Sequence, residues 1–404
     1  MRARGVAFLH AALLFVCVPG LGSAFLLPKL CVLLAGAAWA LGVALRQGRR
    51  GGARERGGGE GRGTLAGWLV LALLAWVGAS TLHADRVDAA DLMLVVAGLV
   101  LLLGLLRSEG LDESVLPMLA RLGTLEAALV LLQMLGLDPL RGLASLAGLQ
   151  PAHLGARLAI EGSLGNPDFV AAWLSAALCL TLGEAARAQA PWARWRWLAQ
   201  VAAQLVALAG ARSFATIASL ALAGVVLGVV GRRSLKWAEA VVALIGLGAL
   251  AGLVADRDLL NVGRGRALLW GLADHLAQAP MLGHGIGAVR TLRAPSIPLV
   301  VLDHAHADPL ELALGAGLPA LLIALALFAL ALLALHRSLS TDRPRALAMG
   351  AALLTLASRS LVDFPLSRPA ELALFVTLVS LALRRAPAAD TPSLTLTTAA
   401  LETP

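Results

Sequence analysis

Histidine and arginine side chains gather in one stretch of the chain, residues 256–309. Four of the eight histidines lie there, and two of them, His304 and His306, are separated by a single residue. Its arginines are Arg257, Arg264, Arg266, Arg290 and Arg293. Because the ordinary pKa of histidine is near ~6.5, its imidazole can accept a proton at neutral pH. Arginine is permanently charged and binds phosphate through paired N–H groups. These residue types suit proton transfer beside a phosphorylated group.

The same side chains could instead bind a metal ion. His304 and His306, followed by Asp308, have the residue types of a zinc site, but no second pair of ligands follows at a typical spacing. The cysteines all lie inside apolar runs and form neither a disulfide framework nor a CxxC motif; they are Cys17, Cys31 and Cys179. We therefore predict no bound metal and no cofactor.

The elements that carry these residues must be membrane helices. Apolar residues make up 59% of the chain and charged residues 14%, against about 45–50% and roughly 25% in soluble domains. A bilayer span needs about 20 mostly apolar residues, and such runs recur to residue 385, which predicts a single all-α polytopic transmembrane domain, 1–385, of about twelve helices. The predicted spans are 6–22, 25–45, 65–83, 87–106, 114–136, 167–186, 197–211, 213–231, 235–255, 310–335, 346–363 and 370–384.

The distribution of Lys and Arg predicts the orientation. Most of the 33 basic residues fall in alternate short segments between the spans, which is the positive-inside pattern. Both termini and the Gly/Arg-rich, flexible loop 46–64 are then cytoplasmic, and 386–404 is a disordered tail. The long loop 256–309, which is partly helical, is then extracytoplasmic. Since the basic residues are scattered over many loops, the charge of +8 indicates topology and membrane lipids as neighbours, not a nucleic-acid partner.

The first apolar stretch permits two interpretations. Its basic start, Met1–Arg4, and the small residues Gly22–Ala24 fit a cleavable signal peptide as well as a retained helix. A second apolar run follows almost immediately, which favours the retained helix.

Two further extracytoplasmic segments have distinctive local patterns. In Gly165–Asp168, Asn166 is placed to cap a helix and Pro167 to occupy its first position. The segment Ala207–Phe214 leaves almost no loop between two spans, which predicts a tight helical hairpin that holds Arg212 at one depth. Charged residues at such depths are costly and usually face a cavity or a partner.

The chain resembles the superfamily of O-antigen ligases and O-antigen polymerases over about residues 160–370. The matching segments occur in the order typical of that superfamily: Gly162–Ala171, Gly210–Ser213, Gly263–Trp270, Ala279–Gly287, His304–Pro319 and Ser360–Leu366. The chain departs from the usual pattern at three positions. Ala307 stands where Asn is common, Pro309 where an aromatic residue often follows, and Asp168 where Asn is frequent.

The resemblance implies a GT-C-like fold and a metal-independent glycan transfer at the outer face of the bacterial inner membrane. The donor would be a polyprenyl-pyrophosphate-linked glycan, and the acceptor a lipid A-core, a growing polysaccharide or a protein. It implies His306 as the general base and Arg212 as the catalytic pyrophosphate ligand. Substrate-binding roles would fall to Arg266, Arg290, His304 and Asp308.

Several alternatives stay open at this point. The sequence does not separate ligase from polymerase, and it does not show which of Asp303, Asp308 and Glu311 orients His306. A transporter or flippase of a lipid-linked glycan or another solute is the main alternative function. It is disfavoured because the spans contain few mid-membrane polar residues: Glu126, Gln133, Gln200, Gln204 and Glu239. A non-catalytic scaffold would leave the His/Arg-rich loop unexplained.

Overall fold

The computed structural model describes residues 3–16, 25–50, 60–108, 111–140, 142, 160–230, 270–290, 292 and 304–385. Within these ranges the secondary structure is helical and contains no β-strand, which confirms the all-α prediction. The α-helices are α1 (Ala3–Phe15), α2 (Leu26–Arg50), α3 (Glu60–His83), α4 (Ala89–Arg107), α5 (Val115–Met134), α7 (Pro167–Arg187), α8 (Pro191–Ala211), α9 (Phe214–Val230), α12 (Asp308–Arg337), α13 (Arg343–Ser360) and α14 (Pro369–Arg384). Short 3₁₀ helices are η1 (Trp270–Ala277), η2 (Ala288–Arg290), η3 (Ser338–Ser340) and η4 (Pro365–Ser367).

Six helices in the described ranges are long and apolar enough to cross a bilayer. These stretches are Leu26–Gln47, Leu65–His83, Ala89–Arg107, Val115–Met134, Pro167–Arg187 and Asp308–Ser340. Every predicted span overlaps a helix except 235–255, which lies outside the described residues, as do residues 17–22 of the first span. The chain is therefore a helical, membrane-embedded protein.

The predicted flexible loop 46–64 is shorter in the structure. Helix α2 continues to Arg50 and α3 already begins at Glu60, so only 51–59 of the loop falls outside the described residues. Residues 46–50 are mostly arginine and glutamine, which are good helix formers, and this favours the extension of α2 beyond its apolar span. The tail 386–404 lies outside the described residues, as do 256–269 of the long loop. The described part of that loop contains η1 and η2, so it is partly helical as predicted.

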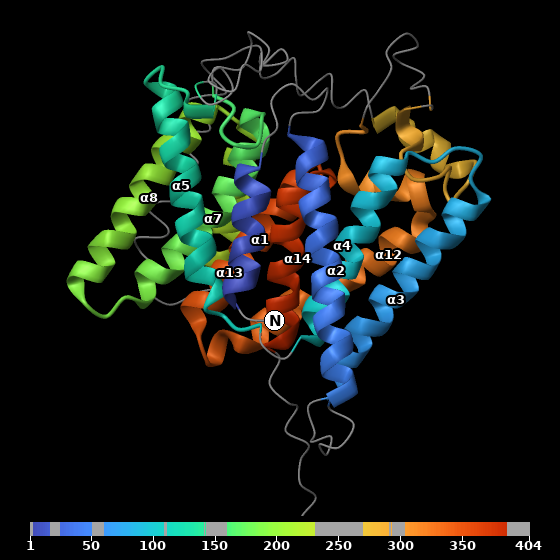
Figure 1. Ribbon diagram of the computed structural model, residues 1–404, viewed down its shortest axis with the longest axis horizontal. Coiled ribbons are helices and arrows are strands. Elements are labelled where there is room, and N and C mark those ends of the chain that lie inside the picture. Colours follow the sequence, from blue (N-terminus) through green and yellow to red (C-terminus); the bar gives the residue numbers. More distant parts are fainter. Residues whose placement is uncertain are drawn as a thin grey trace, which may run out of the picture.

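Helix α14 runs through the middle of the bundle, behind α1 and α2 in the view of Figure 1. It packs against α4 and α12 on one side and against α13 and α7 on the other. Helices α5 and α8 pack on α7 toward one edge, and α3 packs on α12 toward the opposite edge. As a result, α7 is nearly enclosed by protein, and its Trp173 is fully buried.

Helix α1 is fastened to the bundle by polar contacts. Its His10 is buried, and the Nε2 atom lies 3.0 Å from the Thr377 hydroxyl of α14. Lys29 of α2 donates to the carbonyl oxygens of Leu13, at 2.6 Å, and of Leu14. These carbonyls end α1 without an intrahelical partner, so the buried lysine satisfies them and matches the negative end of the helix dipole. In this structure α1 is an integral part of the bundle.

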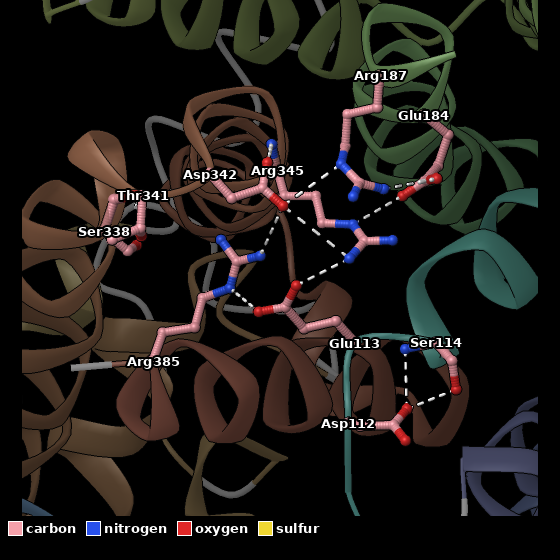
Figure 2. Close-up of polar contacts among 10 residues, drawn as sticks. All are labelled: Asp112, Glu113, Ser114, Glu184, Arg187, Ser338, Thr341, Asp342, Arg345 and Arg385. Atoms are coloured by element: carbon pink, nitrogen blue, oxygen red, sulfur yellow. Dashed lines mark hydrogen bonds and ion pairs between the residues drawn. The ribbon is translucent and has the colours of Figure 1, made fainter. Parts of the chain in front are cut away.

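An ion-pair cluster joins four segments at one end of the bundle, as Figure 2 shows. Arg345 of α13 contacts Glu113, before α5, at 2.9 Å and Glu184 of α7 at 3.1 Å. Arg385, which follows α14, also pairs with Glu113. Arg187 of α7 contacts Asp342, the N-cap of α13, at 3.3 Å. Charges of both signs are therefore matched here, and the ends of α7, α13 and α14 are held together.

Helix α12 is broken near its first third, and the break is filled by the loop that precedes it. Gly317 has φ 84° and ψ 170°, which an L side chain would not adopt at low cost, and an added Cβ would collide with the carbonyl of Met281. The amides of His284 and Gly285 donate to the carbonyls of Leu314 (2.7 Å) and Gly315 (2.9 Å). The segment Gly283–Gly287 is thus paired to α12 along its backbone.

Candidate functional site

Two histidines and a phenylalanine form the centre of the site, just before α12. His304 is buried, and its Nδ1 lies 2.9 Å from Glu311 Oε1. Its ring stacks on Phe364 with centroids 4.2 Å apart, and the ring of His306 meets the same phenylalanine edge-on at 4.8 Å. One aromatic ring therefore holds both imidazoles in place.

His306 has the features of a positioned base. Its side chain is 34% exposed, but its Nδ1 is buried and faces Asp363 Oδ1 at 3.7 Å. Since Nδ1 points at the carboxylate, Nε2 is the nitrogen left for a substrate. The backbone has φ 51°, and non-glycine residues in this region cost of order 1 kcal/mol or more. Such strain is typical of residues that the surrounding structure holds for function.

The carboxylate beside His306 belongs to a buried network around Arg359 of α13. The Arg359 side chain has no exposed surface, and its Nη2 lies 2.6 Å from Asp363 and 3.3 Å from Asp168. Its Nη1 donates to the hydroxyls of Ser213, at 3.0 Å, and Thr216. Ser213 in turn donates to Asp168 at 2.6 Å. Arg359 therefore ties α7, α9 and α13 together at this end and fixes the carboxylate that faces His306.

Of the carboxylates near His306 in sequence, none faces its ring in the described residues. Glu311 binds His304 instead. Asp308 is buried and accepts hydrogen bonds from the Leu366 amide at 2.9 Å and the Ser367 hydroxyl at 3.0 Å. Asp308 therefore fastens the start of α12 to η4, while Asp303 lies outside the described residues.

Arg212 lies where the predicted hairpin places it. It is the C-cap of α8 in the left-handed conformation, with φ 49°, and α9 begins two residues later. The side chain is exposed and has no ion pair within the described ranges, while its neighbour Ser213 belongs to the Arg359 network. Arg212 and His306 are the two non-glycine residues with positive φ in the described part of the chain.

The two other arginines that were predicted to bind substrate are Arg290 and Arg266. Arg290 pairs with Asp88 at 2.5 Å and Asp91 at 3.5 Å, so its guanidinium holds η2 against the start of α4. Arg266 lies outside the described residues. No group of three or more His, Cys, Asp or Glu side chains with metal-binding geometry occurs among the residues the structure describes.

No role was assigned from the sequence to three residues of the site, Arg359, Asp363 and Arg368, although Asp363 lies in the matching segment Ser360–Leu366. The first two have a signal that was available, because a basic and an acidic residue four positions apart at the end of an apolar helix can pair. Arg368 has none, since it follows two turn residues and resembles an ordinary basic residue at a helix end. Its guanidinium lies over the rings of Phe169, at 4.4 Å, and Phe364, at 4.9 Å.

Comparison with known proteins adds no assignment. No protein-family model matches the chain, and no curated protein matches it.

Proposed function

We propose that this protein is a metal-independent glycosyltransferase similar to the O-antigen ligases and polymerases. It would have about twelve membrane-spanning helices in a GT-C-like arrangement. Each of them must be roughly 20 residues long to cross a bilayer. The donor is a polyprenyl-pyrophosphate-linked glycan, and the acceptor is a lipid A-core, a growing polysaccharide or a protein. The site faces the outside of the bacterial inner membrane, and both termini are cytoplasmic.

One observation supports this proposal above the others. His306 is held with Nδ1 against Asp363, at one end of the same helices whose opposite ends form the ion-pair cluster. A base that faces a carboxylate, with Arg368 on the same Phe364 ring and Arg212 adjacent in sequence to Ser213 of the Arg359 network, supplies the groups that transfer from a pyrophosphate requires.

The proposed reaction is a single displacement. The acceptor hydroxyl oxygen attacks the anomeric carbon while His306 Nε2 accepts its proton. The new C–O bond forms as the bond to the phosphate oxygen breaks, and the electron pair leaves with the polyprenyl pyrophosphate. Asp363 stabilises the protonated imidazole, and arginine stabilises the charge that develops on the leaving group. The His306 proton then passes to solvent.

Transport is the second candidate, because the break in α12 resembles the discontinuous helices of transporters. Such breaks serve transport when their free backbone groups face the solute. Here the groups around the break are used within the protein. The Leu318 amide binds the Pro280 carbonyl at 2.9 Å, and Trp76 and Ser80 donate to the carbonyls of Ala316 and Gly315.

Four of the five mid-membrane polar residues are also used within the protein, while Glu239 lies outside the described residues. Gln204 donates to Thr124 at 3.1 Å, and Thr124 donates to Gln200 at 2.9 Å. Glu126 accepts from the amide and hydroxyl of Ser163, and Gln133 from the Gly162 amide. These contacts join helices to one another, which weakens the case for a solute pathway lined by the same residues.

The test is release of polyprenyl pyrophosphate by purified protein in detergent, with a native lipid-linked glycan, candidate acceptors and EDTA. His306→Asn is the informative variant, because asparagine tolerates positive φ but cannot act as the base. We expect release to fall by ~10²–10⁴-fold. His336→Asn, an exposed histidine at the far end of α12, is the matched control and should keep full activity.

Release that is unchanged in His306→Asn would remove the base from the proposal. If wild-type protein with a cooperative thermal transition releases nothing with any acceptor, transport becomes the better explanation. Movement of the same lipid across liposomes would then be measured.

A further inference from the structure

Arg368 differs from Arg290 and Arg359, whose guanidinium groups pair with carboxylates, in having no ion pair with a described residue. It is the N-cap of α14, and its guanidinium carbon lies 4.4 Å from the ring centroid of Phe169 and 4.9 Å from that of Phe364, two rings that meet edge to face. Its side chain makes no hydrogen bond or ion pair with any described residue, and its Nε is buried without a partner. The side chain thus presents unsatisfied N–H donors in a largely desolvated position.

Carboxylates surround Arg368 without touching it. Burial lowers the pKa of Arg368, and the charges of Glu371, Asp363, Asp91 and Glu311 act in the opposite direction without overcoming it. The guanidinium nevertheless stays charged, because arginine is not deprotonated in proteins at ordinary pH. An unpaired, desolvated cation is costly, so an anion that completes its hydrogen bonds would be bound favourably.

The neighbouring Arg359 provides an internal comparison. Arg359 is fully buried and contacts Asp363, Asp168 and two hydroxyls, which leaves it no free charge for a ligand. The two arginines lie at the same end of the bundle, so the difference between them is in their contacts and not in their depth alone. Arg359 organises the site, and Arg368 is available to a substrate.

We propose that Arg368 is a phosphate-binding residue that holds the diphosphate of the lipid-linked donor. This inference rests on the proposed function and goes beyond it, because it assigns the donor contact to Arg368, a residue to which no role was assigned from the sequence. The guanidinium contacts two aromatic rings and has no hydrogen-bond partner among the described residues, so its N–H groups are available for the paired contact that arginine makes with phosphate.

The position of Arg368 relative to His306 fits this role. Both contact Phe364, the arginine over the ring face at 4.9 Å and the histidine at its edge at 4.8 Å, so they lie within about 10 Å of each other. The base must lie ~3 Å from the acceptor oxygen, and that oxygen ~3–3.5 Å from the reacting carbon. The diphosphate lies beyond that carbon, so a cation at this separation is within reach of it.

Binding of undecaprenyl pyrophosphate to the full-length protein in detergent tests the proposal. Undecaprenol serves as the uncharged probe, and phosphatidylglycerol tests whether an ordinary phospholipid headgroup occupies the site instead. Arg368→Met removes the charge and the donors but leaves an unbranched, polarisable side chain that can still pack near the two rings. Arg337→Met, an exposed arginine at the far end of α12, is the control.

We expect Arg368→Met to raise the Kd for undecaprenyl pyrophosphate by ~10- to 100-fold, the value of a charged hydrogen-bonding contact. The Kd for undecaprenol should not change, and Arg337→Met should match wild type for both lipids. Arg368→Lys, which keeps the charge without the planar donors, should give an intermediate Kd. If Arg368→Met does not fold, Arg368→Lys takes its place in the experiment. A Kd of Arg368→Lys for undecaprenyl pyrophosphate equal to that of wild type would then overturn the proposal.

The outcomes separate the two proposals. If wild type prefers the pyrophosphate lipid to undecaprenol and Arg368→Met binds it equally well, Arg368 is not the ligand but the proposed function stands. If phosphatidylglycerol competes with equal affinity in wild type but not in Arg368→Met, the residue binds phospholipid headgroups and the donor assignment is wrong. If wild type shows no preference for the pyrophosphate lipid, both proposals fail together.

Discussion

Replacing the Arg359–Asp363 pair tests whether the site is held by a buried ion pair or by packing. The variants are Arg359→Met, Asp363→Leu and the double variant, each of which exchanges a charged side chain for an apolar one of similar size. The Arg359 side chain has no exposed surface and that of Asp363 is 3% exposed, with 2.6 Å between their charged atoms. Each single variant therefore leaves one charge in a place from which water is excluded.

The contacts set the expected magnitudes. Breaking a buried pair by removing one partner costs about 3–5 kcal/mol, whereas replacing both with apolar side chains is often neutral. In Asp363→Leu, Arg359 keeps Asp168 at 3.3 Å, which places the loss near ~3 kcal/mol, the lower end of that range. In the double variant Asp168 is not stranded, because its side chain is 37% exposed and still accepts from Ser213. We therefore expect the double variant to recover most of the loss.

Thermal unfolding in detergent and glycan transfer are measured on the same preparations. Both single variants should melt several degrees below wild type, and the double variant close to it. Transfer should stay low in both variants that lack Asp363, because the carboxylate that faces His306 at 3.7 Å is gone. Arg337→Met removes an exposed charge and should change stability by no more than about 0.5 kcal/mol.

Two results would refute this reasoning. A double variant as unstable as the single variants would mean that packing or the hydroxyl contacts, and not charge pairing, stabilise this end of the bundle. A double variant that is stable and fully active would show that Asp363 does not support His306.

Two further predictions concern the frame around the site. Gly317→Ala should lower the free energy of unfolding by about 2 kcal/mol or more, because a Cβ would collide with the Met281 carbonyl and φ is 84°. Gly78→Ala is the control and should not destabilise the protein, because nothing lies within 4 Å of the added Cβ. An equal loss of stability in both variants would contradict the explanation. Burial acts to raise the pKa of Glu113, but the hydrogen bonds and charges of Arg385 and Arg345 outweigh it and hold the pKa below its usual value. The stabilisation by the charged Glu113 is present above the unfolded-state pKa of ~4.3 and is lost as the pH falls through the lowered folded-state pKa. The melting temperature of Glu113→Gln should therefore be lower than that of wild type at pH 7, and the difference should vanish in acid.

The sequence predicts the local features of this fold well. Apolar runs locate the helices, and Asn166 caps α7 with Pro167 at its first position, as the pattern indicates. The Asp168 amide donates to the Asn166 side chain at 2.8 Å. The tight connection that ends α8 at Arg212 is likewise confirmed. These features depend on neighbouring residues, so periodicity and capping rules suffice to find them.

The contacts that build the site are not local, and the sequence did not predict them. Arg359 meets Asp168 across 191 residues, and Arg290 meets Asp88 across 202. The carboxylate nearest His306 comes from Asp363 and not from the acidic residues beside it in sequence. A single sequence indicates which side chains can pair, but only the packing of the helices decides which do.

The two ends of the bundle together favour an enzyme over a transporter. Helices α7, α13 and α14 are joined at one end by the ion pairs of Arg345, Arg187 and Arg385, and α7 and α13 are joined at the other by Arg359. Alternating access requires one group of helices to rock against another around a fixed site. Such motion would separate the buried Arg359–Asp363 pair from its partners at one end, at a cost of several kcal/mol. At the other end it would break several partly exposed ion pairs, each at a smaller cost. A transferase needs no such motion, because its catalytic groups work best when they are held in place before the substrate arrives. The same contacts that would oppose transport keep the carboxylate opposite His306.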